Sequence, residues 1–361
     1  MKTLYKKDSK GKIRKLVLSV EGDVLVQESG IIDGKTVRHE KECKPKNVGK
    51  SNATTAEEQA ESELQAKYDI KLSEGYFDSQ RAAETQQVLM PMLAKVYEDH
   101  SAKIDWENAF IQPKLDGMRC LAVIKDHKVT LLSRKNKEII TMAHIAEELK
   151  ALPDMILDGE LYAHGKTFQE NMKLIKKYRK GESEDVKFHT YDMVLEDRFL
   201  LRYNTLELLH KASAFSDIEL VPTVEVTEEQ VVKDHHKLFL AAGYEGTMIR
   251  HGDSSYKVNG RSDALLKYKD FQDITATIID VVEADQIKGH GVPVLKYTNK
   301  KLSGTNEFTF RAGTKMSHED RIDLLSNKDK YIGQTAEIRF FEYTDEGLPR
   351  FPLMVGIRLD C

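Results

Sequence analysis

The last 90 or so residues have the sequence pattern that most narrowly limits what this chain can fold into. Short runs rich in Val, Ile, Thr, Phe and Tyr follow one another there at close spacing, and one helix-like run, 317–327, lies between two of them. About five strands and one helix in this length predict a small Greek-key barrel of the OB type over 271–361. The strand-like runs are 273–284, 293–299, 307–313 and 335–344.

The first 80 residues show a different pattern. Apolar runs broken by Gly and Asp-Gly up to about residue 50 predict a small antiparallel sheet. Thr55 and Glu58 then form a capping box, apolar residues recur every four positions along one face, and Gly75 ends the predicted helix. We therefore expect a small domain of one sheet and one helix over 1–80, with a linker at 78–87.

Strands and helices alternate in the middle of the chain, which we assign to one domain over 85–270. The helix expected at 228–242 starts with a capping box made by Thr227 and Gln230. The three parts together predict an α+β protein. Strands are expected near 108–114, 119–125, 128–133, 155–162, 187–195 and 246–250, and further helices near 142–152, 167–180 and 199–214.

Composition excludes several classes of protein. Of the 361 residues, 40% are hydrophobic and 32% charged, and no run approaches the roughly 20 apolar residues of a membrane span. The first residues contain no apolar stretch of a secretory signal. Cys43, Cys120 and Cys361 lie too far apart for a metal motif or a disulfide framework. These features predict a reduced intracellular protein that does not contact a membrane.

Charge is unevenly distributed along the chain. Residues 1–50 contain 13 Lys and Arg against 7 Asp and Glu, whereas residues 51–100 contain 4 against 10. A basic segment of this kind is either a face that binds phosphates or ordinary solvated surface. The total charge of −4 does not exclude a nucleic-acid partner, because a local basic face is sufficient.

The stretch 109–123, AFIQPKLDGMRCLAV, places charged residues at the end of an apolar strand-like run. A lysine becomes a nucleophile when nearby cations or burial lower its pKa, so Lys114 is a candidate for covalent catalysis. Asp116 is two positions further on and would share its strand face, and Gly117 allows a tight turn. The alternative is a charged strand end without chemistry.

Five further stretches carry polar residues at predicted strand ends. Taken singly, each can be a charged strand end; together they supply cations for phosphates, carboxylates for a metal or a ribose, and an aromatic ring for a base. Such a set describes a nucleotide site with a nucleophilic lysine. The stretches hold Ser133 and Arg134; Asp158 and Glu160; Phe188, Tyr191 and Asp192; Glu245; and Lys267 with Lys269.

The order of these stretches resembles that of the covalent nucleotidyltransferases, and most closely the ATP-dependent DNA ligases. The shared series is K-L-D-G-M-R, S-R, D-G-E-L, Y-D, E-G-T-M-I-R and L-L-K-Y-K, over about 90–361. The ending FFEYTDEGLPRFPLMVGIR is similar to the OB domain of small viral, phage and bacterial ligases. The resemblance implies an enzyme that seals nicks between a 5′-phosphate and a 3′-hydroxyl in duplex DNA through lysyl-AMP and DNA-adenylate.

The same resemblance assigns roles to individual residues. Lys114 would attack the α-phosphate of ATP and carry AMP, while Asp116 and Glu245 would help to hold Mg²⁺. Lys267 and Lys269 would bind the α-phosphate and stabilise its transition state. Six further residues would bind the nucleotide or the nick: Arg119 and Arg134 through phosphates, Glu160 through the ribose, Tyr191 by stacking on adenine, Gln112 at the adenine edge, and Arg261 through a phosphate.

Two departures from the family pattern stand out. The C-terminal R-x-D-K motif occurs here as RLDC, with Arg358 and Asp360 present but Cys361 in place of lysine. The E-G-T-M-I-R stretch ends in Arg250, where many relatives have lysine. Arg350 or Arg358 would then orient pyrophosphate in another way.

The N-terminal part resembles a WGR-type module, a small nucleic-acid-binding sheet and helix, although the Trp-Gly-Arg signature itself is absent. The resemblance of the rest of the chain to DNA ligases implies a monomer that clamps nicked duplex DNA between its adenylation and OB domains. It also implies action in the cytoplasm or at the nucleoid, in a host cell if the gene is from a phage or virus.

Two other functions remain open from the sequence. One is a related enzyme, an RNA ligase or an mRNA-capping guanylyltransferase, although the OB-like ending favours DNA. The other is a nucleic-acid-binding protein that uses this fold without catalysis, against which the complete set of lysines, acids and arginines argues.

Overall fold

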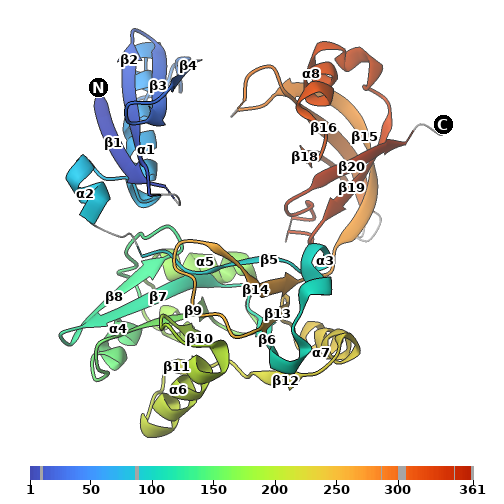
Figure 1. Ribbon diagram of the computed structural model, residues 1–361. Helices are drawn as coiled ribbons and strands as arrows, with labels where there is room; N and C mark the ends of the chain where they lie inside the picture. The colour runs from blue at the N-terminus through green and yellow to red at the C-terminus, as the bar shows by residue number, and fades with distance from the viewer. Residues whose placement is uncertain (9–10, 86–88, 286, 300–305, 345, 359–361) are drawn as a thin grey trace. The chain divides into compact units, whose positions relative to one another are not determined.

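The computed structural model describes residues 1–8, 11–85, 89–285, 287–299, 306–344 and 346–358. It divides into two compact units, Met1–Tyr268 and Lys269–Cys361, which are described here one at a time (Figure 1). No helix among the described residues is long and apolar enough to cross a membrane. The mixture of helices and mainly antiparallel sheets confirms the predicted α+β class.

The N-terminal part is an antiparallel sheet covered by one helix. Leucines from the first three strands pack against Ala60 and Leu64 of helix α1 (Ala56–Ser73), so one sheet face forms a small core. The Thr55–Glu58 capping box is confirmed. The strands pair in chain order: β1 (Lys2–Lys7), β2 (Ile13–Glu21), β3 (Val24–Ile31) and β4 (Thr36–Glu42).

The stretch expected as a plain linker, 78–87, instead contains a short helix, α2 (Gln80–Thr85). The side chain of Ala83 is buried and α2 contacts β1 and β2, so this helix belongs to the N-terminal sheet. The likeness to a WGR-type module and the predicted domain boundaries remain predictions.

Two five-stranded sheets form the middle of the chain. The first is covered by α4 (Ala143–Leu149), α5 (Phe168–Lys176) and α6 (Phe199–Ala212), whose apolar side chains complete its core. Its strand order is β11 (Ile218–Leu220), β10 (Lys187–Met193), β9 (Met155–Tyr162), β7 (Met118–Lys125) and β8 (Lys128–Ser133).

The second sheet has its own core, to which α3 (Tyr97–His100) and α7 (Glu229–Ala241) contribute. The N-cap of α7 is Glu228, which makes no side-chain cap bond, so the predicted capping box of Thr227 and Gln230 was wrong by one position. The strand order is β12 (Val224–Val226), β6 (Ala109–Lys114), β13 (Gly246–His251), β14 (Arg261–Tyr268) and β5 (Leu93–Val96).

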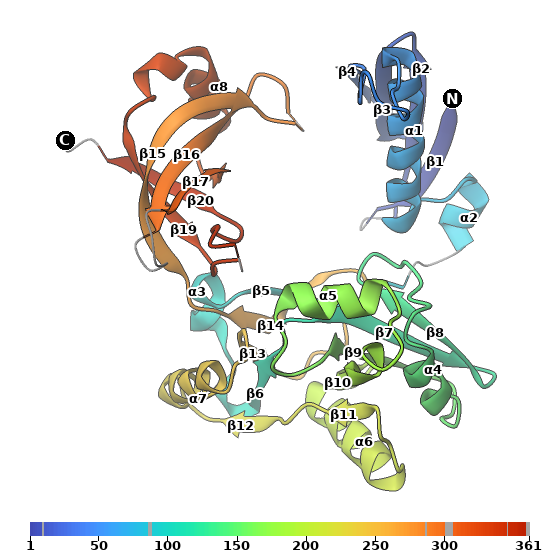
Figure 2. The ribbon, with the colours of Figure 1, turned by 180° about the vertical axis from the view of Figure 1, so that it is seen from behind.

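The C-terminal unit is a six-stranded sheet with one helix, which confirms the predicted OB-like domain. Its long first strands bend strongly, as Figure 2 shows, and enclose a core that includes Ile278, Leu295 and Ile338. Helix α8 (His318–Ser326) is capped by the side chain of Ser317. The strands are β15 (Gln272–Glu283), β16 (Gly291–Asn299), β17 (Asn306–Arg311), β18 (Gly313–Thr314), β19 (Thr335–Phe340) and β20 (Leu353–Arg358).

Candidate active site

Lys114 is the last residue of β6, and the five residues before it in this strand are buried. The neighbouring strand β13 is preceded by Glu245, whose backbone N–H donates to the Lys114 carbonyl oxygen at 2.8 Å. The Lys114 Nζ also donates to the Glu245 carboxylate. The lysine side chain keeps 20% of its surface exposed. The sheet therefore fixes this amine at a strand end where a ligand can reach it.

The turn after β6 requires glycine at position 117. A Cβ there would lie 2.2 Å from the Leu161 carbonyl oxygen and 2.9 Å from Cγ of Glu160, closer than any real side chain tolerates. Gly117 therefore allows the turn that carries Asp116 to pass directly against β9 of the other sheet. Residues of both sheets meet at this point.

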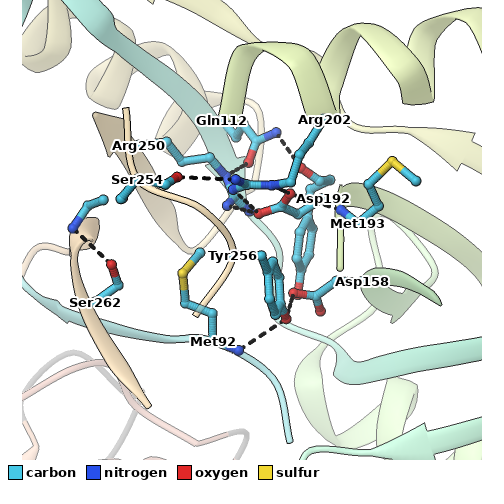
Figure 3. Close-up of polar contacts among 12 residues, drawn as sticks. Met92, Gln112, Asp158, Asp192, Met193, Arg202, Arg250, Ser254, Tyr256 and Ser262 are labelled. Atoms are coloured by element: carbon cyan, nitrogen blue, oxygen red, sulfur yellow. Dashed lines mark hydrogen bonds and ion pairs between the residues drawn. The ribbon is translucent and has the colours of Figure 1, made fainter. Parts of the chain in front are cut away.

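Arg119 of β7 is anchored by Asp158 of β9. Its Nε and Nη2 donate to the two carboxylate oxygens at 2.9 and 2.5 Å, and the Asp158 side chain is fully buried. Burial opposes the charge of Arg119, but Asp158 outweighs it and holds the pKa of the guanidinium well above its ordinary value. Tyr256 donates a further hydrogen bond of 2.6 Å to Asp158 (Figure 3). Arg119 is thus held in one orientation at the site.

Glu160 and Tyr191 lie on neighbouring strands of the first sheet, β9 and β10. The Tyr191 hydroxyl donates to the Gly159 carbonyl oxygen at 3.2 Å and to Glu160 Oε2 at 3.4 Å. Burial raises the pKa of Glu160 to about 7, although the positive charges of Lys114 and Arg119 act in the opposite direction. Near neutral pH this carboxyl group is therefore present in both protonation states.

A buried ionic cluster lies beside these residues, made of Asp192, Arg202 and Arg250 (Figure 3). Arg202 donates from Nε and Nη2 to the two Asp192 oxygens at 2.7 and 3.1 Å, and Arg250 Nη1 donates to Oδ2 at 2.5 Å. All three residues are at most 3% exposed. We call this set the Asp192 cluster. It connects β10 of the first sheet with β13 of the second.

Gln112, predicted to bind the adenine edge, is attached to this cluster. Its Oε1 accepts from Arg250 Nε at 2.8 Å, and its Nε2 donates to the Tyr191 carbonyl oxygen at 3.2 Å and to Thr223 Oγ1 at 2.8 Å. The amide is 1% exposed and bonded to protein at both ends. In this conformation Gln112 positions the backbone of Tyr191, and its contact with adenine remains a prediction.

Lys267 lies in β14, opposite Met248 of β13. Burial lowers its pKa, and the positive charges of Lys114, Arg261 and Arg134 lower it further. Only Glu98 acts to raise it among the causes of this shift. The structure thus gathers four of the predicted cations around one place, where repulsion among them favours the binding of an anion.

Strand β14 ends at Tyr268, so Lys269 lies just beyond the strand that carries Lys267. Lys269 is the first residue of the second unit, and its Nζ lies 4.1 Å from the centre of the Phe341 ring. Arg350 also lies over Phe341 and donates to Glu342. Arg358 ends β20, and Asp360 and Cys361 are outside the described residues.

No group of three or more His, Cys, Asp or Glu side chains that could hold a metal ion occurs among the described residues. Of the predicted metal ligands, Glu245 accepts a hydrogen bond from Lys114 Nζ, and Asp116 lies in the turn two residues after Lys114. Mg²⁺ is commonly bound by one or two carboxylates together with substrate phosphates and water. This pair fits that mode of binding and does not fit a site built from protein ligands alone.

The chain matches two family models, "ATP dependent DNA ligase domain" over residues 91–269 and "DNA ligase OB-like domain" over residues 295–358. A DNA ligase of African swine fever virus is 27% identical, with 96% of this chain and 85% of the relative aligned. A DNA ligase of Enterobacteria phage T4 is 24% identical, with 68% of this chain and 62% of the relative aligned.

Solved structures give the same fold. A structure described as "Pmar-Lig_Pre." has a TM-score of 0.67 at 22% identity, covering 83% of this chain and 71% of its own. A structure from work on Lig E DNA ligases has a TM-score of 0.61 at 23% identity, covering 75% of this chain and all of its own. At such identities these two structures establish the fold alone.

Proposed function

Because this chain belongs to the ATP-dependent DNA ligases, we propose that Lys114 is the residue that carries AMP. The family seals nicks in duplex DNA through a lysyl-AMP intermediate. One observation carries the assignment: the Lys114 amine projects from the end of a buried strand, is bound to Glu245, and lies within the field of Lys267. The site therefore combines a fixed nucleophile with a surplus of positive charge for phosphates.

The first step is nucleophilic substitution at phosphorus. The Lys114 amine attacks the α-phosphorus of ATP, a nitrogen–phosphorus bond forms, and the bond from phosphorus to the pyrophosphate oxygen breaks. Glu245, already bonded to the amine, is positioned to accept the proton that it loses. Lys267, Arg134 and Arg261 balance the charge that develops on the phosphate oxygens.

The nucleoside part of ATP faces residues of the first sheet. Tyr191 stacks on the adenine ring, and Glu160 accepts hydrogen bonds from the ribose hydroxyls. The hydrogen bond from Tyr191 to Glu160 sets the orientation of both groups. The Asp192 cluster and Gln112 hold the strand that carries Tyr191.

The later steps use the same phosphate-binding groups. AMP passes from Lys114 to the 5′-phosphate of the nick, which Arg119 and Arg134 contact. The 3′-hydroxyl then attacks that phosphate and releases AMP. Lys269 is also proposed to act in catalysis. The chain is proposed to work as a monomer that closes its adenylation and OB domains on the duplex. The proposed place of action is inside a cell, in a host if the gene is viral.

Mg²⁺ is part of the proposal. Asp116 and Glu245 are the carboxylates that would hold it, and the ion would neutralise part of the triphosphate charge.

Labelled nucleotide tests the proposal. Wild-type protein incubated with α-labelled ATP and Mg²⁺ should acquire an acid-labile label, lose it to nicked DNA and produce sealed product. Lys114→Ala and Lys114→Arg should not be labelled, whereas Lys125→Ala, at an exposed position, should be labelled like wild type. Labelling by GTP would indicate a capping enzyme, and sealing of nicked RNA alone would indicate an RNA ligase. Absence of label on the wild-type protein, or label on Lys114→Ala, would contradict the assignment.

A further inference from the structure

One face of the N-terminal sheet changes character along its strands. Under helix α1 this face carries buried leucines, among them Leu4 on β1 and Leu16 on β2. Side chains on one face of a strand recur every two residues, so Lys6 and Arg14 continue the same face. These two residues are direct partners in the β1–β2 ladder. Where the apolar core ends, the face therefore becomes positively charged.

These residues line a hollow of about 300 Å³. Its wall also includes Lys15, Tyr76 and Lys71, which is in the last turn of α1. Asp8 is the single acidic residue of the lining. Because Lys15 points to the opposite face of β2, three cationic side chains, Lys6, Arg14 and Lys71, stand against the carboxylate of Asp8 and make this hollow complementary to an anion.

Part of the cationic wall is held in place by other contacts. Lys6 Nζ donates to the Glu74 carbonyl oxygen and Lys71 Nζ to the Glu74 carboxylate, each at 2.6 Å. Both ammonium groups also lie over the Tyr76 ring, 5.5 and 5.7 Å from its centre. These contacts fix the positions of the two lysines before any ligand arrives, which reduces the entropy that binding must cost.

Arg14 has no such contact. Among the described residues it makes no ion pair, and its side chain is exposed. Burial lowers the pKa of Lys6, and Lys71 lowers it further while Glu74 raises it. A phosphate in the hollow would relieve this repulsion and pair with Arg14.

We propose that this hollow binds a backbone phosphate of duplex DNA. The inference rests on the proposed function, which gives the chain nicked DNA as its substrate. Lysine and arginine contacts to phosphates provide affinity that does not depend on base sequence, and a ligase has to bind nicks in any sequence. The N-terminal part thus adds a sequence-independent anchor to the nick-sealing enzyme.

Paired charge removal in the full-length protein tests this site. Lys6→Gln with Arg14→Gln removes two cations from the hollow. Lys7→Gln with Lys12→Gln removes two from exposed positions next to the same strands, outside the hollow. We expect the first pair to weaken binding to nicked duplex DNA about 10-fold at low salt. Since each phosphate contact contributes a slope of about 0.9, loss of this one contact should also reduce the slope of log K against log salt by about 1. The control pair should change both quantities much less.

Several outcomes would overturn the site. Equal losses in the two pairs would show that only overall charge matters, and no loss in either would show that the hollow does not contact DNA. Weaker binding to duplex RNA without weaker binding to duplex DNA would assign the hollow to another partner. The charge-conserving pair Lys6→Arg with Arg14→Lys should bind within about twofold of wild type.

Self-adenylation, measured on the same preparations, separates this proposal from the proposed function. Both pairs should be labelled by ATP at the wild-type rate, because the hollow is not part of the nucleotide site. If wild type itself is not labelled, the proposed function fails while the binding comparison still decides the role of the hollow. If the pair in the hollow does not fold, Arg14→Gln alone should reduce the salt slope by about 1, and an unchanged slope would overturn the site.

Discussion

The nucleotidyltransferase part of this protein contains two groups of charged residues in which the charges are balanced in opposite ways. In the Asp192 cluster every charge has a hydrogen-bonded partner of opposite sign and is shielded from water. Around Lys267 the charged neighbours are mainly other cations, and burial together with these cations lowers the pKa of its amine. A charged side chain that is buried and bonded to an opposite charge is therefore structural, whereas one surrounded by like charges is suited to bind a ligand, whatever its residue type.

Arg250→Met should produce the largest loss of stability. It leaves the buried Asp192 with one arginine instead of two and removes the donor to Gln112. Asp192 keeps Arg202 as a partner, and a hydrogen bond to a charged group contributes about 1.5–3 kcal/mol, so we expect a decrease of that size in the free energy of unfolding. Urea denaturation measures it. A loss below about 1 kcal/mol would remove the distinction between the two groups.

Lys267→Ala should show the opposite pattern. Loss of a cation that stabilises charge in the transition state commonly costs about 10²–10³-fold in rate, and we expect this decrease in self-adenylation. Because burial and neighbouring cations disfavour the charge of Lys267, the free energy of unfolding should stay unchanged or increase. Single-turnover labelling and urea denaturation give the two quantities. Lys237→Ala, at an exposed position on α7, is the control. A destabilised but fully active Lys267→Ala would contradict the assignment.

Glu160→Gln tests whether burial perturbs a charge of the nucleotide site, through the pH dependence of the free energy of unfolding. The folded pKa of about 7 lies above the unfolded value of about 4.3, so the folded state binds the extra proton between these values. The stabilisation from this proton is complete below about pH 4.3 and is lost as pH rises to 7. Relative to wild type, the glutamine variant should therefore gain stability across this range, by at most about 4 kcal/mol, and the difference should level off above pH 7.

Urea denaturation at a series of pH values measures this difference. Glu182→Gln, which removes an exposed carboxyl group, serves as the control. A flat difference between Glu160→Gln and wild type from pH 4.5 to 7 would show that Glu160 is not buried in the way described.

Arg198→Ala should have the smallest effect. Its guanidinium lies 3.4 Å from the Asp253 carboxylate, but the two side chains are 44% and 66% exposed. Exposed pairs contribute at most about 1 kcal/mol, so urea denaturation should detect little change. A cost like that of Arg250→Met would mean that burial is not what separates the two kinds of ion pair.

Much of the fold was predictable from the sequence because long elements carry a periodic pattern. Strands β8 and β9 have the predicted bounds, since six and eight residues suffice to show the pattern. Strands β11 and β12 have only three residues each, too few for any periodicity, and they were missed. The end of strand β14 was not predictable from local sequence either. It depends on pairing with β13, and the ladder between these strands ends at Tyr268, one residue before Lys269.

Sequence order singled out several residues that the structure brings into contact, such as Lys114 with Glu245, and Glu160 with Tyr191. The partners that hold such residues were not predictable. Tyr256 bonds to Asp158 across 98 positions of sequence, and Arg250 bonds to Asp192 across 58. Nothing local in the sequence marks which carboxylate an arginine will choose, because that choice depends on how the two sheets meet.

The Asp192 cluster has a consequence for folding cooperativity. Its members come from β10 in one sheet, β13 in the other and helix α6, so the cluster belongs to neither sheet alone. If the first sheet opened while the second stayed folded, Arg250 of β13 would keep its charge in an apolar interior without its carboxylate partner, which is strongly unfavourable. The first sheet is therefore not expected to open before the second, so that the strand carrying Tyr191 is only as mobile as the whole domain.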